Sequence, residues 1–474
     1  MPDLRQWVSK VQEMGELKVV EGADWDLEIG TLSSLCARKK DGPALLFDKV
    51  KGYLSGYRVL SNCTSGEARV AYTLNLTPNL RGLQLIDALR HKFTDWQKTY
   101  EQFPSEVVKI GPLMENVQDG NDVDLLKFPT PRWHELDLGR YIGTADAIVT
   151  RDPDSGEINV GTYRMQLQNR NTCSLYISPG KHGRIHIEKY HARGQAAPVA
   201  VSLGHHPLIF RVACIELPAG SEYQFAGAIS QKPVAVIIEE VTGLPVPAES
   251  EIVIAGFCPK GKMMDEGPFG EWTGYYASGT RPAPIFEVAR VYHRNNPILL
   301  GSHNGVPPHE ETCFHTVVKS ALLHNELINM GLPDVRGVWL SEFGFQQFLI
   351  VSIRQRYAGH AKQAALLASQ SRIGGYLGRY VVVVDDDIDP TDTQEVLWAI
   401  CTRSDPEKDI DILRRCWSSA LDPIATRSGG AYFNSRAVID ACKPFEWKED
   451  FPKEITISPE LVDRVRKKFG DLLR

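Results

Sequence analysis

Apolar residues recur at helical spacing near the start of the chain. Leu4, Trp7, Val8 and Val11 are three or four positions apart, which places them on one side of an amphipathic helix. Similar patterns predict further helices, most of them in the first 120 residues and after residue 310. These helices are expected at 31–39, 65–74, 84–100, 182–192, 221–229, 313–328, 359–367 and from Pro459 onward.

The pattern changes between residues 140 and 300, where short β-rich runs alternate with turns. Such spacing is typical of a β-barrel or sandwich core. The order along the chain is therefore α/β, then β, then α/β. A linker is predicted at 119–131, which begins with turn residues and ends with two prolines. The expected strands are 44–47, 145–150, 158–167, 174–177, 199–203, 233–240, 251–256, 285–292, 297–302, 335–339, 348–352 and 380–384.

Length and composition fit a globular protein. The 474 residues suggest three domains at about 150 residues each. Hydrophobic residues at 43% and charged residues at 24% exclude a disordered, collagen-like or membrane-bundle chain. A net charge of −6 argues against a broadly basic, nucleic-acid-binding surface, so an anionic ligand would need locally concentrated positive charge.

The chain has the features of a cytoplasmic protein without a membrane partner. No segment approaches the ~18–20 apolar residues needed to cross a bilayer, and the first residues lack the apolar core of a signal peptide. The nine cysteines are scattered without a CxxC pair, which is typical of a reducing compartment.

Two motifs resemble a phosphate loop and a calcium-binding loop, but each lacks a residue that such a site needs. Residues 256–262 match GxxxxGK, but Met263 stands where a phosphate loop needs Ser or Thr before a helix. The aspartates at 385–387 point in alternating directions, and Pro390 occupies the position that an EF-hand loop gives to Gly. We expect a solvated turn there.

Glu266 and Glu271 flank a Gly-Pro-Phe-Gly turn that can fold back and bring both carboxyl groups together. In a dry pocket the two groups would repel, so the pKa of one would rise and that group could donate a proton near neutral pH. The alternative is a surface turn with two solvated glutamates.

Asn159 and Arg164 lie on a predicted strand but differ by an odd number of positions, so they share a face only if the strand bends. Gly161 permits such a bend. Arg164 could then hold a carboxylate through two parallel hydrogen bonds, or else lie in solvent at a sheet edge.

His182 and Glu222 add an imidazole and a carboxylate to the amide oxygen of Asn159. This donor set suits manganese or magnesium better than a structural zinc site. No spacing rule connects the three residues, and a histidine such as His182, taken alone, is more often a hydrogen-bonded structural residue.

Together these residues resemble the UbiD-type decarboxylases, which use prenylated FMN. The most specific match is Glu266-Gly-Pro-Phe-Gly-Glu271 with Gly274-Tyr275, and the resemblance extends over nearly the whole chain. Val160 and residues 439–442 depart from the family pattern. The other matching positions are Asn159, Arg164, His182, Glu222, Ala361-Lys362, Trp398-Ala399, Thr402-Arg403 and Leu421-Asp422-Pro423.

The resemblance implies three domains and an oligomer. Residues 1–125 would form an N-terminal α/β domain, 126–308 a central split β-barrel of flavin-reductase type that binds prenylated FMN, and 309–474 a C-terminal α/β oligomerisation domain. The assembly would be a homodimer or a homohexamer, and a flavin prenyltransferase would supply the cofactor.

The resemblance also implies the ligands of the cofactor. Asn159, His182 and Glu222 would bind a divalent metal, manganese or magnesium, that bridges to the cofactor phosphate, with a potassium ion nearby. The residues that would border the flavin or its phosphate are Gly161, Thr162, Tyr163, Arg164, Lys181 and Lys362.

By the same resemblance, Arg164, Glu266 and Glu271 would form the catalytic network. The substrate would be an aromatic, heteroaromatic or α,β-unsaturated carboxylic acid that forms a covalent adduct with the cofactor, which then accepts the electrons as CO2 leaves. Glu271 would be the general acid, and the reaction would be reversible under high CO2. His309 and Cys313 would lie in the substrate pocket.

Two other functions remain open at this point. A flavin oxidoreductase would use the same kind of barrel with NAD(P)H and would not need Glu271. A non-catalytic subunit of a multi-protein carboxylase would leave the intact Arg164, Glu266 and Glu271 unexplained.

Overall fold

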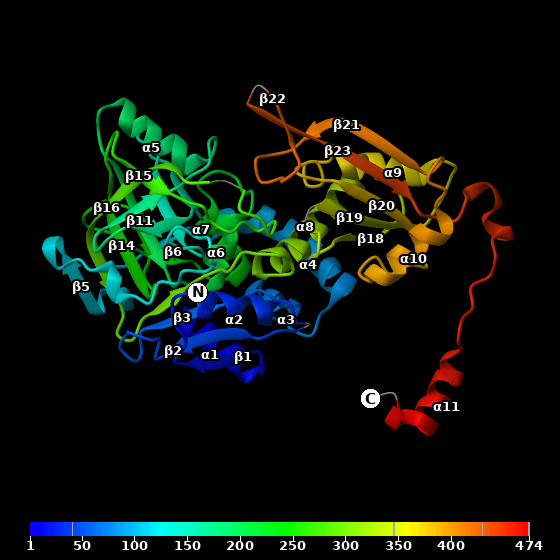
Figure 1. Ribbon diagram of the computed structural model, residues 1–474, viewed down its shortest axis with the longest axis horizontal. Helices are drawn as coiled ribbons and strands as arrows, with labels where there is room; N and C mark the ends of the chain where they lie inside the picture. The colour runs from blue at the N-terminus through cyan, green and yellow to red at the C-terminus, as the bar shows by residue number, and fades with distance from the viewer. Residues whose placement is uncertain (40, 278, 345–346, 429, 473–474) are drawn as a thin grey trace.

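The chain folds into two bodies joined by a long helix, with one further helix standing apart from both (Figure 1). The architecture is that of a computed structural model, which describes residues 1–39, 41–277, 279–344, 347–428 and 430–472. The joining helix is α8 (Glu310–Asn329), which packs on α4 (Gly82–Thr99) and on β18 (Val335–Leu340). The expected α/β, β, α/β class is confirmed.

The N-terminal residues build a four-stranded sheet in the order β1-β2-β3-β17. The predicted first helix is confirmed, because its four apolar residues are buried and Asp3 caps it through the Gln6 amide. The strand expected at 297–302 is also present, but it pairs with β3 here and does not belong to the central sheet. The elements are α1 (Leu4–Glu13), β1 (Leu17–Glu21), α2 (Glu28–Ala37), β2 (Ala44–Asp48), β3 (Arg58–Ser61), α3 (Glu67–Thr73) and β17 (Ile298–Leu300).

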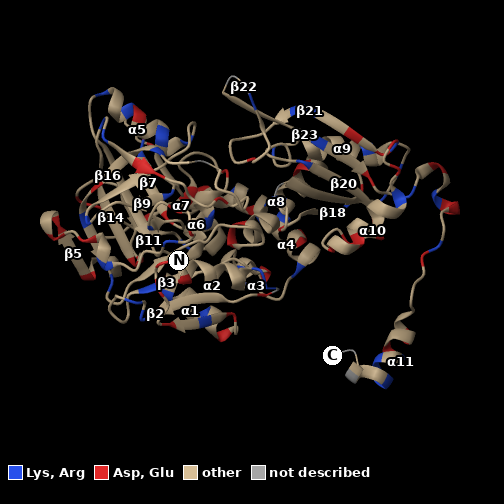
Figure 2. Cartoon of the chain, in the orientation of Figure 1, with Lys and Arg blue, Asp and Glu red and all other residues tan. Residues whose placement is uncertain are grey.

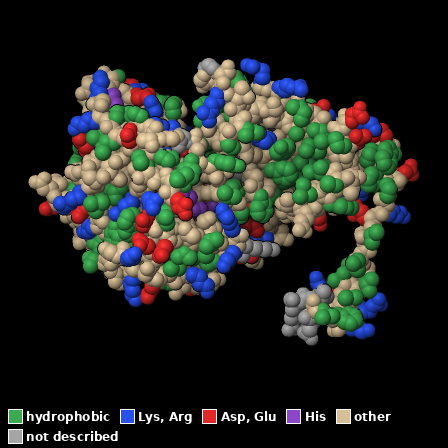
Figure 3. Space-filling model, in the orientation of Figure 1, with side chains coloured by type: hydrophobic (Ala, Val, Ile, Leu, Met, Phe, Trp, Pro, Cys, Tyr) green, Lys and Arg blue, Asp and Glu red, His purple; other side chains and the backbone are tan. Residues whose placement is uncertain are grey.

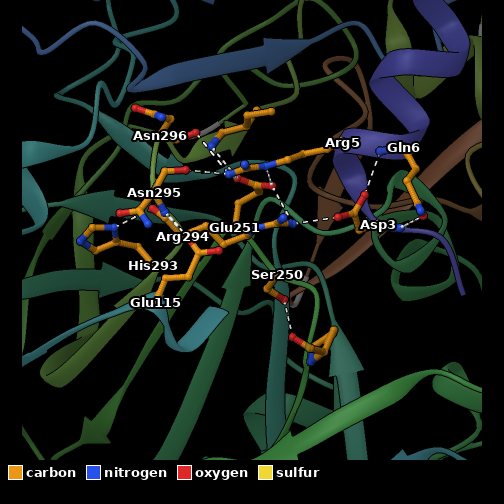
Figure 4. A network of polar contacts seen from close by, with 12 residues as sticks. Asp3, Arg5, Gln6, Glu115, Ser250, Glu251, His293, Arg294, Asn295 and Asn296 are labelled. Carbon is orange, nitrogen blue, oxygen red and sulfur yellow. Dashed lines mark hydrogen bonds and ion pairs between the residues drawn. The ribbon is translucent and has the colours of Figure 1, made fainter. Parts of the chain in front are cut away.

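A network of ion pairs holds α1 against the central body (Figure 4). The Glu251 carboxylate is fully buried and accepts hydrogen bonds from Arg5 Nε at 2.8 Å and Arg5 Nη2 at 2.9 Å. Arg294 lies 3.3 Å from the same carboxylate and donates to Asp3 at 2.8 Å. Because each buried charge has a partner, the first helix is held against the ends of two central strands.

The central body is a ten-stranded sheet in which the pairs along its main path are antiparallel. Its order is β6-β9-β10-β16-β14-β11-β7-β8, with β5 and β15 also paired to β16. Its strands are β5 (Asn116–Asp119), β6 (Tyr141–Gly143), β7 (Ala147–Arg151), β8 (Ile158–Gly161), β9 (Met165–Leu167), β10 (Thr172–Leu175), β11 (Ala197–Leu203), β14 (Ile252–Cys258), β15 (Met263–Glu266) and β16 (Arg281–His293).

Helices and a small second sheet surround the central sheet. The helices expected at 182–192 and 221–229 are confirmed within one residue, whereas the strand expected at 233–240 belongs to the small sheet. The segment predicted as a linker at 119–131 is instead packed into the body, because β5 pairs with β16 and Leu125 and Phe128 are buried. These elements are α5 (His182–Ala192), α6 (Pro207–Cys214), α7 (Glu222–Ser230), β4 (Glu106–Val107), β12 (Ala235–Ile238) and β13 (Pro245–Pro247).

The chain crosses between the two ends of the central sheet at residues 162–164. The single strand expected at 158–167 is therefore wrong: β8 lies at one end of the sheet order and β9 near the other. Four peptide steps from Gly161 to Met165 span at most about 14 Å, so the two edges lie close together and the sheet curls into a half-barrel. Arg164 is placed at this seam.

The C-terminal body is a sheet in the order β18-β19-β20-β23-β21, with β22 paired to β23. The turn at 385–387 is not fully solvated as expected, because Asp385 is buried and accepts from Gln355 Nε2 at 2.8 Å. Its remaining elements are β19 (Phe348–Ile353), α9 (His360–Gln370), β20 (Tyr380–Asp385), α10 (Thr393–Arg403), β21 (Ile410–Trp417), β22 (Thr426–Ser428), β23 (Ala431–Asp440) and α11 (Pro459–Phe469).

Positively and negatively charged residues are interspersed along the chain in Figure 2. Within the described residues, none of the helices has the length and hydropathy that a membrane crossing requires.

Candidate active site

Arg164 and Glu266 form a bidentate ion pair beneath the seam of the half-barrel. Arg164 Nε donates to Glu266 Oε1 at 2.6 Å, and Arg164 Nη2 donates to Glu266 Oε2 at 2.9 Å. The side chain of Arg164 is 10% exposed and that of Glu266 is fully buried. The arginine therefore does not lie in solvent at a sheet edge.

Glu271 reaches the same guanidinium from the other side of the turn. Arg164 Nη1 donates to Glu271 Oε1 at 2.5 Å, and the Glu271 side chain is 13% exposed. The turn is held by a hydrogen bond from Gly270 N to the buried carboxylate of Asp137 at 3.0 Å. The predicted fold-back is confirmed, and the alternative of two solvated glutamates is wrong.

The two carboxyl groups have different surroundings. Glu266 accepts two N–H groups from Arg164 and a hydrogen bond from the Tyr141 hydroxyl at 3.3 Å, and it lies 3.7 Å from Arg281. Burial raises the pKa of Glu271, against the opposing influence of Arg164. The raised pKa of Glu271 favours the protonated form that a general acid needs.

Aromatic rings cover the guanidinium of Arg164. Its central carbon lies 4.8 Å from the ring centre of Tyr176 and 5.1 Å from that of Phe269. Burial alone would lower the pKa of Arg164, but Glu266 and Glu271 reverse this and raise it. The guanidinium therefore stays charged in a site with little water, where its ion pairs are strong.

Asn159, His182 and Glu222 lie at or next to the first residue of three neighbouring elements around Tyr163. Asn159 is in β8, His182 is the first residue of α5 and Glu222 is the first residue of α7. The Tyr163 hydroxyl accepts from Asn159 Nδ2 at 3.2 Å and from the backbone N–H next to His182 at 3.3 Å. Glu222 in turn accepts a hydrogen bond from the backbone beside Asn159.

These residues fit a divalent cation and an anionic cofactor. Burial raises the pKa of Glu222 to about 7, so its charged form would gain from a bound cation. A Cβ atom at Gly161 would lie 2.4 Å from the Tyr163 hydroxyl, and one at Gly183 would lie 2.7 Å from the same ring. Only glycine allows this close approach of the Tyr163 ring at the start of α5.

The structure places the other predicted residues as follows. Thr162 donates to the Asp146 carbonyl at 2.8 Å, and Lys181 is exposed at the start of α5. Lys362 instead forms an ion pair with Asp411 of β21, within the C-terminal body. Its contact with a phosphate group therefore stays a prediction.

The two predicted substrate-pocket residues lie at the start of α8. His309 is buried and donates through Nε2 to the Trp272 carbonyl at 3.0 Å, so it supports the turn that carries Glu271. Cys313 is half-buried, and burial raises the pKa of its thiol to about 12. Their contact with a substrate stays a prediction.

A cavity of about 160 Å³ opens beside Glu271, and sequence reasoning missed most of its lining. His134 Nε2 and His303 Nε2 lie 3.1 Å apart within it, and His134 Nδ1 lies 3.1 Å from Asp137. No motif connects the lining residues, because they come from separate segments. They include Arg38, His134, Glu271, Tyr275, Tyr276 and His303.

Comparison with known proteins gives a consistent result. Three family models of 3-octaprenyl-4-hydroxybenzoate carboxy-lyase match this chain: the N-terminal domain at 8–89, the Rift-related domain at 106–307 and the C-terminal domain at 313–441. A phenolic acid decarboxylase of Bacillus subtilis is 31% identical over 93% of this chain and 92% of its own length. One of Sedimentibacter hydroxybenzoicus is 30% identical, over 100% and 98%.

Solved structures agree over the full length. The vanillic acid decarboxylase of Sedimentibacter hydroxybenzoicus in open form, with truncated ShVdcD, superposes with a TM-score of 0.83 at 28% identity, covering 99% of both chains. The UbiD-class enzyme HmfF from Pelotomaculum thermopropionicum in complex with FMN superposes with a TM-score of 0.86 at 27% identity, covering 99% of this chain and 100% of that one.

Proposed function

Because this chain belongs to the UbiD family of carboxy-lyases, we propose that it reversibly decarboxylates an aromatic, heteroaromatic or α,β-unsaturated carboxylic acid with prenylated FMN. The observation that carries the proposal is the placement of Arg164 between Glu266 and Glu271 in one buried site. Bound prenylated FMN would supply an electron sink for the carbon that loses CO2. The chain's own residues bind and orient the substrate and supply the proton that replaces its carboxylate.

Arg164 binds the substrate carboxylate through its guanidinium, and Glu266 fixes the plane of that guanidinium through two hydrogen bonds. After CO2 leaves, Glu271 donates its proton to the carbon that carried the carboxylate. The raised pKa of Glu271 favours the protonated form that this step needs. In the reverse direction Glu271 takes the proton back.

Asn159, His182 and Glu222 would hold a divalent metal, manganese or magnesium, whose positive charge would favour binding of the anionic cofactor. The oxygen-rich donor set and the burial of Glu222 support this assignment. The same proposal places Gly161, Thr162 and Tyr163 at the flavin edge, with a potassium ion nearby. Lys181 and, after a movement of the C-terminal body, Lys362 would add positive charge at the phosphate.

The cavity beside Glu271 favours an acid whose ring carries a hydrogen-bonding group. His134 and His303 both line this cavity with their Nε2 atoms 3.1 Å apart, and their imidazoles are polar groups that could contact a ring substituent there. Burial lowers the pKa of His303 well below its usual value, so this imidazole is neutral at pH 7 and can accept or donate a hydrogen bond. A phenolic hydroxyl fits these partners.

A second copy of the chain is the proposed partner of α11. Leu461, Val465 and Phe469 are four residues apart on one face of this helix, and none of its residues is buried. Figure 3 shows apolar side chains along α11 and gathered over the C-terminal body. Deleting residues 451–474 should turn a homodimer or homohexamer into a smaller species by light scattering, whereas an unchanged mass would contradict this role.

The decisive experiment is co-expression of the chain with a flavin prenyltransferase, followed by a screen of phenolic and other aromatic acids for CO2 release. Release from at least one acid, abolished in Glu271→Gln, is expected. If no acid releases CO2 although the cofactor is shown to be bound, the proposal is wrong. Oxidation of NAD(P)H by the same preparation would favour a flavin oxidoreductase instead.

A further inference from the structure

A second arginine, Arg281, lies beside the ion pair of Arg164 and Glu266. Arg281 is the first residue of β16 and stands opposite Glu266, the last residue of β15, in the paired strands. Because directly opposite residues of paired strands share a face, their side chains are neighbours. Arg281 Nε lies 3.7 Å from Glu266 Oε2, the oxygen that also accepts a hydrogen bond from Arg164 Nη2. The two guanidinium groups therefore meet at one carboxylate.

The ring of Tyr176 contacts both guanidinium groups. Its centre lies 3.6 Å from the central carbon of Arg281 and 4.8 Å from that of Arg164. Such contact with the face of an aromatic ring is attractive for a cation. The side chain of Arg281 is 33% exposed, against 10% for Arg164. Arg281 thus lies at the border between the buried ion pair and the solvent.

Most hydrogen-bond donors of Arg281 have no acceptor in the described part of the chain. An arginine side chain carries five N–H donors and keeps its charge in proteins. Within the described residues, the guanidinium of Arg281 has Glu266 as its ion-pair partner but makes no hydrogen bond, and its Nε is buried. Since Glu266 already accepts two hydrogen bonds from Arg164, donors of Arg281 are available to a further anion.

The charges of the site favour binding of such an anion. Once a substrate carboxylate reaches Arg164, this arginine faces two negative groups, because Glu266 stays paired with it. Arg281 balances the second negative charge, since Glu271 carries its proton in the proposed reaction. Unbalanced charge in a site with little water costs free energy. Burial raises the pKa of Glu271, and the positive charge of Arg281 opposes this rise, so its influence extends across the site.

We propose that Arg281 is a substrate-binding residue that supplies the second positive charge for the carboxylate of the acid. The inference rests on the proposed function, since it takes the substrate carboxylate to bind at Arg164. It concerns the binding of an anion and not the chemical step. Loss of Arg281 should therefore weaken the binding of carboxylates, whereas a neutral ligand with the same ring should bind as before.

The test compares benzoate with benzamide, which has the same ring and a similar shape but no charge. Binding of each ligand to the full-length chain, co-expressed with a flavin prenyltransferase, is measured by calorimetry at low salt. Arg281→Met should weaken benzoate binding by about 10-fold to 100-fold, the usual worth of an interaction with a charged group, and leave benzamide binding unchanged. Arg281→Lys should recover most of the affinity for benzoate, because it restores the positive charge.

Arg170→Met is the matched control. Arg170 lies in the turn between β9 and β10 of the same sheet, where its exposed side chain is 3.6 Å from Asp124. This variant removes the same charge from the chain and should keep the wild-type ratio of benzoate to benzamide affinity. Thermal denaturation of each variant separates a lost contact from a lost fold, and Arg281→Gln replaces Arg281→Met if the latter does not fold.

Several outcomes would overturn the inference. These are a wild-type chain without preference for benzoate, an unchanged affinity ratio in Arg281→Met, an Arg281→Lys variant no better than Arg281→Met, or the same loss in Arg170→Met. Failure of the proposed function has a different signature. A chain that prefers benzoate through Arg281 but releases CO2 from no acid would keep the anion site and lose the proposed reaction.

Discussion

Arg164 holds Glu266 through two parallel hydrogen bonds of 2.6 Å and 2.9 Å, although the two residues are 102 positions apart in the chain. The bidentate pair uses two of the five guanidinium N–H groups, and Glu271 accepts one of the three that remain. A substrate carboxylate can compete with Glu271 for these remaining donors without disturbing the pair with Glu266. Glu266 therefore fixes the position of Arg164, while the contact of Arg164 with Glu271 can be replaced by a contact with the substrate carboxylate.

Replacing Glu271 by Gln removes the acidic proton while keeping the size of the side chain. We expect turnover to fall by about 100-fold or more, since general acid catalysis commonly contributes that much. Flavin absorbance and metal content of the purified variant should equal those of the wild type. Turnover at the wild-type rate would refute the role of Glu271 as proton donor.

Replacing Arg164 by Lys keeps the positive charge but removes the planar pair of donors. Glu266 would lose at least one of its two hydrogen bonds, and the substrate carboxylate would be misplaced. We expect kcat/KM to fall by about 100-fold, as small misplacements in active sites do. Steady-state kinetics measures this loss, and a conserved kcat/KM would mean that charge alone is sufficient.

Asn159→Ala and His182→Ala should each lose bound metal and, with it, the retained flavin. The reason is that each removes one donor of the proposed metal site, beside the Tyr163 hydroxyl. Elemental analysis and the flavin absorbance of purified protein check both losses. His191→Ala, in the last turn of the same helix, is the control that should keep them. Normal metal content in both site variants would refute the assignment.

Two buried histidines should make the protein sensitive to mild acid. Burial lowers the pKa of His205 and His206 to about 3, whereas the unfolded chain takes up their protons near pH 6.5. Their pKa values are lower when folded, so stability falls as pH drops from 6.5 toward 3, by about 2 kcal/mol per histidine at pH 5.

His206→Asn isolates one of these histidines, because Asn can still accept the hydrogen bond from Leu208 N at the start of α6. The difference in unfolding free energy between pH 7.5 and pH 5, measured with urea, should shrink by about 2 kcal/mol. His91→Gln, on an exposed side chain, should leave that difference unchanged. Equal acid sensitivity of His206→Asn and wild type would contradict this explanation.

Glu251→Ala should destabilise the contact between α1 and the central body. The change leaves Arg5 without its carboxylate partner and Arg294 with Asp3 alone, and breaking a buried pair costs about 3–5 kcal/mol. Chemical denaturation measures the loss. Glu13→Ala removes an exposed ion pair with Lys10 and should change the unfolding free energy by less than about 1 kcal/mol.

Local patterns in the sequence predicted most of the α-helices correctly, but they missed α6, α10 and several strands, among them β1, β21 and β23. The spacing of Leu4, Trp7, Val8 and Val11 was enough for α1, because burying one apolar face is a local requirement. The same reasoning failed at 158–167, where β-forming residues continue through a point at which the chain leaves one sheet edge for the other. No local preference marks that crossing, since it depends on which strands become neighbours.

By itself, the sequence determined the chemical groups and the short turn that joins Glu266 to Glu271. It also determined the resemblance from which the roles of Asn159, His182 and Glu222 were inferred. Only the tertiary structure decided that Arg164 lies between the two glutamates, 102 and 107 positions away, and that His134 and His303 meet beside them. The reason is physical: the curl of the central sheet brings its edges together, and such closure arises from long-range strand pairing that no local pattern encodes.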